Sequence, residues 1–89
     1  MKIALVTGAG RKEGLGFETS RQLGGMGFHV VLSARKLAQA EEMAGLLRKE
    51  NISVSALEID TTDENSVRNA VRYVSENYNQ LDVLINNAA

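Results

Sequence analysis

The chain has 89 residues, of which 44% are hydrophobic, and it carries a formal net charge of −1 with no cysteine. This length allows one small domain with a thin core, and the absence of thiols excludes disulfides, thiolate metal sites and cysteine nucleophiles. The near-neutral charge gives no basic field for nucleic acid and no apolar run approaches the roughly 20 residues of a membrane span, so we expect a cytoplasmic protein with neither nucleic-acid nor membrane partners.

Short β-branched runs alternate along the chain with longer amphipathic segments. The runs predict strands at residues 3–7, 29–33, 53–59 and 82–86. The amphipathic segments, whose apolar residues recur with the 3.6-residue period of a helix, predict helices at residues 14–26, 36–50 and 63–79. Thr62 is expected to cap the amino end of the third helix, because a hydroxyl can accept a hydrogen bond from the first free amides.

Alternation of strands with helices is typical of a parallel sheet whose strands are joined by crossover helices. Right-handed crossovers predict a half-Rossmann fold, a three-layer α/β/α structure whose four-stranded parallel sheet has the order 3-2-1-4. We therefore expect residues 1–89 to form a partial dinucleotide-binding (Rossmann) domain that stops after the fourth strand.

The first predicted strand runs directly into a glycine-rich stretch, residues 7–16, that leads into the first helix. Glycines let a backbone turn sharply near a phosphate, and the free amides of a helix start attract the anion. The sequence contains neither the strict G-x-G-x-x-G fingerprint nor a phosphate-binding G-K-[ST] loop. It fits G-x-x-x-G-x-G at Gly10, Gly14 and Gly16, which predicts nucleotide binding.

Three motifs lie at or just after the ends of strands of the predicted sheet: Val-Thr-Gly at residues 6–8, Asp-Thr-Thr at 60–62 and Leu-Ile-Asn-Asn-Ala at 84–88. In this order they resemble the motifs of the classical short-chain dehydrogenase/reductase family, of which the chain would be the N-terminal half. In that family Thr-Gly begins a T-G-x-x-x-G-x-G loop, whereas five residues separate Gly8 from Gly14 here. The loop is thus two residues longer, and either Gly8 or Gly10 takes the place of the first glycine.

The resemblance implies roles for specific residues in holding a dinucleotide. Glycines would shape the turn at the pyrophosphate beside the Leu15 amide, an aspartate would accept a hydrogen bond from the adenine amino group, and a threonine would lie beside that ring. Asn86 and Ala88 would line the adenosine ribose, although Asn86 is equally interpreted as a tie between strands. The implied cofactor-binding residues are Gly8, Gly10, Arg11, Gly14, Leu15, Gly16, Asp60, Thr61, Asn86 and Ala88.

Arg35 indicates which dinucleotide the site prefers. A site selective for NAD needs a carboxylate just after the second strand, where it accepts from the ribose hydroxyls. The sequence Ser-Ala-Arg at residues 33–35 offers none. A guanidinium at this position pairs with the 2′-phosphate of NADP, so we predict NADP rather than NAD. Arg11 or Lys12 could add a second positive charge.

Other chemically capable side chains are interpreted as structural. His29 has no cysteine, histidine or carboxylate at ligand spacing, so no metal site is predicted. Tyr73 and Tyr78 both fail the family's Tyr-x-x-x-Lys pattern, since Asn77 and Asp82 stand four residues on. Tyr78 lies on the apolar face of its helix and is expected in the core.

The resemblance implies hydride transfer between a nicotinamide and a carbonyl or alcohol, performed by a serine, a tyrosine and a lysine that follow the N-N-A-G run. No catalytic residue is therefore predicted in this chain, which we expect to be inactive alone and to form the N-terminal, cofactor-binding portion of a homo-oligomeric NADP(H)-dependent oxidoreductase. The alternative is a non-catalytic nucleotide-binding or interaction module. A flavodoxin-like signalling domain shares the strand–helix alternation but not the N-N-A-A ending.

Overall fold

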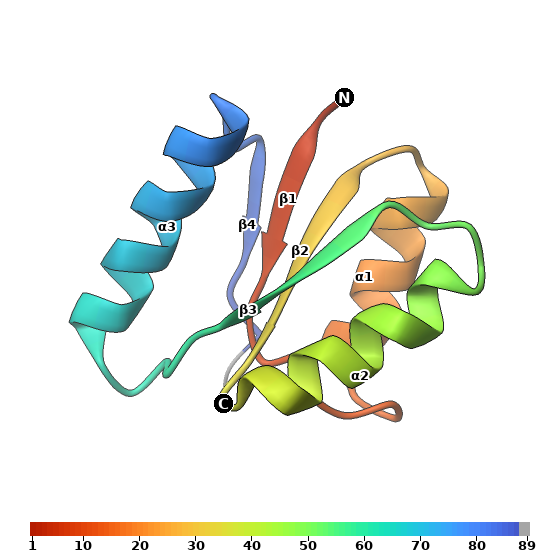
Figure 1. The fold of residues 1–89 in the computed structure, drawn as a ribbon, viewed down its shortest axis with the longest axis horizontal. Helices are drawn as coiled ribbons and strands as arrows, with labels where there is room; N and C mark the ends of the chain where they lie inside the picture. Colours follow the sequence, from red (N-terminus) through yellow and green to blue (C-terminus); the bar gives the residue numbers. More distant parts are fainter. Residues whose placement is uncertain (88–89) are drawn as a thin grey trace.

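The computed structural model describes residues 1–87 as alternating strands and helices (Figure 1). In chain order the elements are β1 (Ile3–Val6), α1 (Leu15–Gly25), β2 (His29–Ala34), α2 (Leu37–Arg48), β3 (Val54–Glu58), α3 (Glu64–Tyr78) and β4 (Val83–Ile85). Each of them overlaps the stretch for which the sequence predicts it. Local hydrophobic periodicity was therefore sufficient to locate the elements in the sequence.

All four strands are parallel and lie in the order β3-β2-β1-β4, which confirms the predicted topology. Val6 at the end of β1 is level with Leu32 of β2 and with Ile85 of β4. The carboxyl ends of the strands consequently meet at one edge of the sheet, the lower edge in Figure 1. In open α/β sheets this edge is where ligands bind, at the point where the strand order reverses, here between β1 and β4.

The helices cover both faces of the sheet, so the molecule has the expected three layers (Figure 1). On the face covered by α1 and α2, a core forms around Phe17, Leu32 and Leu47, which are at most 2% exposed. On the face covered by α3, a second core forms around Leu5 and Val74. Because β1 and β2 contribute to both cores, their residues are buried in succession rather than alternately.

The amino end of α3 corrects one prediction: the cap is Asp63, not Thr62. Asp63 has an extended backbone, and its carboxylate accepts a hydrogen bond from the Asn65 amide at 2.9 Å. The hydroxyl of Thr62 points the other way and donates to Asp60 at 2.6 Å. Both residue types are good caps, and the competing partner of the threonine decided between them.

Gly24, near the end of α1, packs directly against a buried side chain. A Cβ atom at this position would overlap the Cγ2 atom of Ile52. We predict that Gly24→Ala lowers the free energy of unfolding by roughly 1–3 kcal/mol, because overpacking outweighs the roughly 1 kcal/mol that alanine gains in a helix. Urea unfolding followed by circular dichroism measures the change. In an Ile52→Ala background the same substitution should be neutral or stabilising, and a persistent loss there would contradict the overlap as its cause.

His29, at the opposite edge of the sheet from the strand ends, is held in a hydrogen-bonded cluster. Its Nδ1 lies 2.7 Å from the Ser53 hydroxyl, and its Nε2 lies 3.1 Å from that of Ser55. The ring packs on Tyr78 with centroids 5.1 Å apart, and the Tyr78 hydroxyl lies 3.0 Å from that of Ser55. His29 thus makes structural contacts. Tyr78 packs against the core on the α3 face but is only half-buried, so its predicted place in the core is confirmed only in part.

The stability of the fold should depend on the protonation of His29. Burial lowers the pKa of its imidazole below the ordinary value, and the nearby charge of Arg48 adds to the shift. In the unfolded chain the imidazole has a pKa of about 6.5, so it binds protons more readily there than in the fold. The contribution of His29 to the free energy of unfolding is therefore complete above about pH 6.5 and is lost as the pH falls below that value. We expect a higher urea midpoint at pH 8 than at pH 5. His29→Gln should remove this difference; its persistence in that variant would point to another group.

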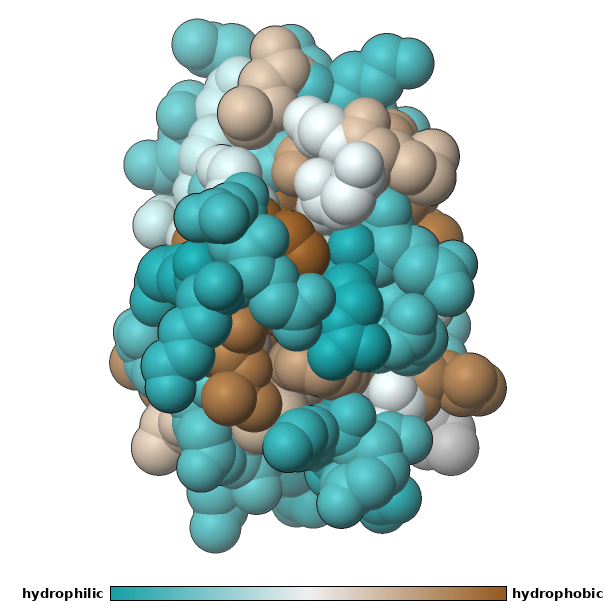
Figure 2. All heavy atoms as spheres, turned by 90° about the vertical axis from the view of Figure 1, so that its right-hand side faces the viewer, coloured by the Kyte–Doolittle hydropathy of each residue, from teal (hydrophilic) through white to brown (hydrophobic). Residues whose placement is uncertain are grey.

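The outer face of the α1–α2 layer is mostly hydrophilic, with hydrophobic atoms visible only in small separate areas (Figure 2). This agrees with amphipathic helices that turn their apolar sides to the sheet. Among the helices in residues 1–87, none is sufficiently long and apolar to cross a bilayer.

Candidate nucleotide-binding site

The glycine-rich loop between β1 and α1 is shaped by a close backbone contact. Gly8 has a φ of 67°, in the region that favours glycine. Gly16, in the first turn of α1, lies so near that a Cβ on it would approach the Gly8 carbonyl oxygen to 2.8 Å and the Ala9 Cα to 3.0 Å. These two glycines let the loop fold back onto the helix start.

The start of α1 carries amides that are free for an anion. Gly14 precedes the helix with an extended backbone, and no side chain caps this end. The first amides of a helix have no intrahelical partner, and together with the helix dipole they attract negative charge. Leu15 is 75% exposed, so the approach to this end of the helix is open to solvent.

The additional loop residues form a separate tight turn. The Gly14 amide donates to the Arg11 carbonyl oxygen at 3.0 Å, which leaves Lys12 and Glu13 at an exposed tip. At the base of the loop, the Ala9 amide donates to the Ser33 carbonyl oxygen at 2.9 Å. The base of the loop is therefore hydrogen-bonded to the end of β2, while Lys12 and Glu13 project into solvent.

Arg35 and Asp60 follow β2 and β3 at the same edge of the sheet. Asp60 accepts hydrogen bonds from the hydroxyl and amide of Thr62 through Oδ1, at 2.6 and 3.0 Å. These bonds lower the pKa of the Asp60 carboxyl below its ordinary value, and the positive charge of Arg35 contributes. The carboxylate is thus ionised at neutral pH and can accept a hydrogen bond from a ligand. Within residues 1–87 the exposed guanidinium of Arg35 makes no ion pair.

Thr7 joins the ends of β1 and β4. Its buried hydroxyl donates to Asn86 Oδ1 at 3.0 Å and accepts from the Asn87 amide at the same distance. Asn86 therefore does tie neighbouring strands together. The side chain of Asn87 lies against the start of α1, where its Nδ2 would be 3.0 Å from a Cβ placed on Gly16. The end of β4 is in this way fixed beside the glycine-rich loop.

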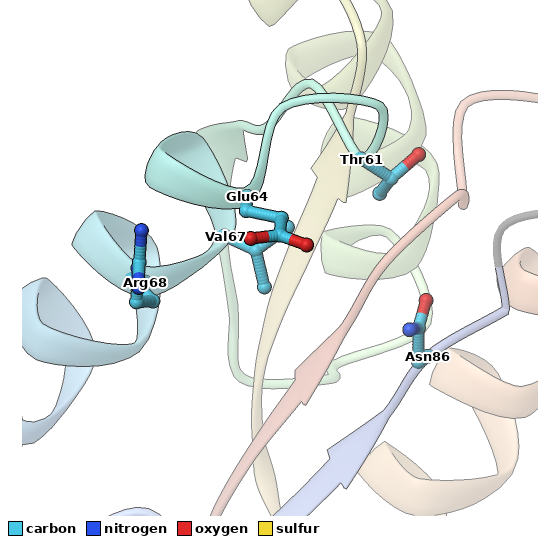
Figure 3. Close-up of a pocket in the computed structure, with 5 residues that line it drawn as sticks. All are labelled: Thr61, Glu64, Val67, Arg68 and Asn86. Atoms are coloured by element: carbon cyan, nitrogen blue, oxygen red, sulfur yellow. The ribbon is translucent and has the colours of Figure 1, made fainter.

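A hollow of about 330 Å³ opens between the start of α3 and the end of β4 (Figure 3). It is lined by Thr61, Glu64, Val67, Arg68 and Asn86. Glu64 points from the first turn of α3 towards the gap between Thr61 and Asn86, whereas Arg68 lies farther along the helix (Figure 3). The hollow thus adjoins the predicted adenosine site.

The structure gathers the described members of the predicted site at one edge of the sheet. All follow the carboxyl end of a strand or lie in the loop and first turn that come after β1. Ala88 lies outside the described residues. Sequence reasoning missed Asn87 and the hollow-lining residues of α3. Of these only Asn87 stands in a motif, the Asn-Asn pair, that could have indicated it.

Comparisons with known proteins identify the family of the chain. The profile of the family described as short chain dehydrogenase matches residues 2–89. The (+)-neomenthol dehydrogenase of Arabidopsis thaliana is 38% identical over 91 residues, covering 98% of this chain and 30% of its own length. The chain spans about a third of the length of the first curated relatives it matches.

Solved structures show the same fold with a dinucleotide. An actinorhodin polyketide ketoreductase variant with NADPH matches with a TM-score of 0.89 and 33% identity, covering 99% of this chain and 33% of that one. A metagenomic short-chain oxidoreductase in complex with NADP also has a TM-score of 0.89, with 28% identity, covering 99% of this chain and 39% of that one.

Proposed function

Because the chain belongs to the short chain dehydrogenase family, we propose that it is the cofactor-binding portion of an NADP(H)-dependent oxidoreductase acting on a carbonyl or alcohol substrate. The main support is the convergence of the glycine-rich loop, Arg35 and Asp60 at the carboxyl edge of the sheet. The relative named as a neomenthol dehydrogenase supports the substrate class. In this proposal residues 1–89 form one partial dinucleotide-binding domain.

The chain's own residues would bind and orient the adenosine half of the cofactor. The close approach of Gly16 to the Gly8 carbonyl oxygen lets the loop turn back onto the start of α1, and the free amides beginning at Leu15 would donate to the pyrophosphate. Asp60 and Thr61 would hold the adenine, and Asn86 and Ala88 the ribose. When bound, the nicotinamide would supply or accept a hydride.

Selection of NADP over NAD would depend on positive charge beyond β2. Arg35 is exposed and, within residues 1–87, unpaired by any acid, so its guanidinium is available to the 2′-phosphate. The two similar structures that hold NADPH and NADP support this assignment. Arg11 follows Gly10 in the same loop and would add a second charge.

We further propose that the 89-residue chain has no dehydrogenase turnover by itself, because the family's Tyr-x-x-x-Lys pattern is absent from it. NADPH oxidation by the purified chain would contradict this. Cytoplasmic location and a homo-oligomeric longer form remain predictions of the sequence.

Binding can be tested by titrating the ¹⁵N-labelled chain with adenosine 2′,5′-bisphosphate and recording amide shifts by NMR. We expect the largest shifts at Gly8, Leu15, Gly16, Arg35 and Asp60. The cluster around His29, at the opposite edge of the sheet, should stay unchanged and serves as the internal control. Shifts centred on that opposite edge, or none at a millimolar ligand concentration, would contradict the proposed site.

A further inference from the structure

Gly10 is enclosed by two segments that sequence reasoning did not bring together. A Cβ on Gly10 would lie 2.9 Å from the Ala34 Cβ at the end of β2. It would also lie 3.3 Å from Gln39 Oε1 and 3.5 Å from Gln39 Cβ in the first turn of α2. Both atoms of Gln39 are near the loop, so its side chain extends towards the lengthened loop rather than away from it.

This contact places Gln39 beside the position expected for the adenosine 2′ oxygen. In this class of fold that oxygen is recognised just after β2, where Ala34 is followed by Arg35. Gly10 lies against Ala34. Arg11 follows Gly10 in the chain and Arg35 follows Ala34, so an arginine comes directly after each of the two residues in contact. Gln39 is exposed, and its side chain makes no hydrogen bond to another side chain or backbone group within residues 1–87.

The local field at the start of α2 favours an anion. No side chain caps this helix, its first turn contains no acidic residue, and Arg35 and Lys36 precede it. Gln39 is thus a neutral side chain with N–H donors in a first helical turn that lacks acidic residues and follows two basic ones. A glutamate in this position would have nearly the same shape, but its negative charge would repel a phosphate.

We infer that Gln39 is a specificity-determining residue, which together with the lengthened loop selects a phosphate on the adenosine 2′ oxygen. The inference rests on the proposed nucleotide site and adds a residue that neither the glycine motif nor the family resemblance indicates. Its carboxamide donates to the phosphate from the α2 side. Gly10 matters because a Cβ there would lie 2.9 Å from the Ala34 Cβ, so only a residue without a side chain lets the loop lie this close to the end of β2, beside Gln39.

The test compares two ligands that differ by one phosphate, adenosine 2′,5′-bisphosphate and adenosine 5′-monophosphate, by calorimetry on the full chain. Gln39→Glu keeps the shape and adds a negative charge. We expect this variant to bind the bisphosphate roughly tenfold more weakly and the monophosphate less than about twofold more weakly. The reason is that the new carboxylate repels the 2′-phosphate, which carries nearly two negative charges and which only the bisphosphate has. Gln39→Lys should shift the preference towards the bisphosphate by about threefold.

Ala38→Glu is the matched control, since it adds the same charge to the same exposed helix turn. Its ligand preference should stay within about twofold of the parent chain. Equal weakening of both ligands by Gln39→Glu, or an equal change of preference in Ala38→Glu, would overturn the assignment. Failure of the parent chain to bind either ligand would instead reject the proposed function, so the two failures are distinguishable.

Discussion

Replacing Arg35 with alanine is expected to weaken the binding of NADPH by roughly 10- to 100-fold, while NADH binding changes little. A charge-assisted hydrogen bond contributes about 1.5–3 kcal/mol, and each 1.4 kcal/mol corresponds to a factor of ten in affinity. Only NADPH carries the phosphate that the guanidinium would contact. Parallel titrations of both dinucleotides at low salt measure the effect.

Two further variants separate this contact from a general effect of charge. Arg35→Lys keeps the charge but loses the planar, bidentate guanidinium, so its NADPH affinity should fall between those of the parent and the alanine variant. Arg72→Ala removes the same charge from the exposed side of α3 and should leave the preference unchanged. If Arg35→Ala retained the NADPH affinity of the parent, selection of the 2′-phosphate by Arg35 would be rejected.

Replacing Gly16 with alanine is expected to weaken the binding of both NADH and NADPH and to destabilise the fold. The new Cβ would meet the Gly8 carbonyl oxygen at 2.8 Å, the Ala9 Cα at 3.0 Å and Asn87 Nδ2 at 3.0 Å. Two of these atoms belong to the backbone, so the loop must shift. We expect the free energy of unfolding to fall by roughly 1–3 kcal/mol. Thermal unfolding and titration with NADH and NADPH measure the two effects.

Gly45→Ala is the control for the glycine substitution. Gly45 lies inside α2, and a Cβ there meets nothing within 4 Å. Alanine should therefore stabilise the chain by up to about 1 kcal/mol and leave nucleotide binding unchanged. If Gly16→Ala behaved like this control, Gly16 would not be the close contact that closes the pyrophosphate turn.

Much of the candidate site could be located from the sequence because its parts follow strand ends. Once the strands and their parallel order are predicted, the residues after them must meet at one edge of the sheet. Arg35 was found in this way, whereas Gly16 was found from the spacing of the glycines and Asp60 through the family resemblance. Asn86 was open to two interpretations, and the structure shows its contact with Thr7. Its contact with a ribose stays a prediction.

The remaining details depended on choices between nearby partners. Thr62 and Asp63 are both good helix caps, and the sequence could not show that Thr62 donates to Asp60 instead. Nothing in the pattern of α2 marks Gln39, because an exposed glutamine in a helix is ordinary. Its place beside Gly10 depends on how α2 lies across the end of β2.

The sequence by itself determined the elements, their order in the sheet and the family. These properties follow from hydrophobic periodicity, from the handedness of crossovers and from short motifs, all of which are local along the chain. Only the tertiary structure decided which side chains of distant segments touch, such as Gly24 with Ile52, His29 with Tyr78 and Gly10 with Gln39. Such contacts are set by strand register and helix placement to within an ångström, and no local pattern records that information.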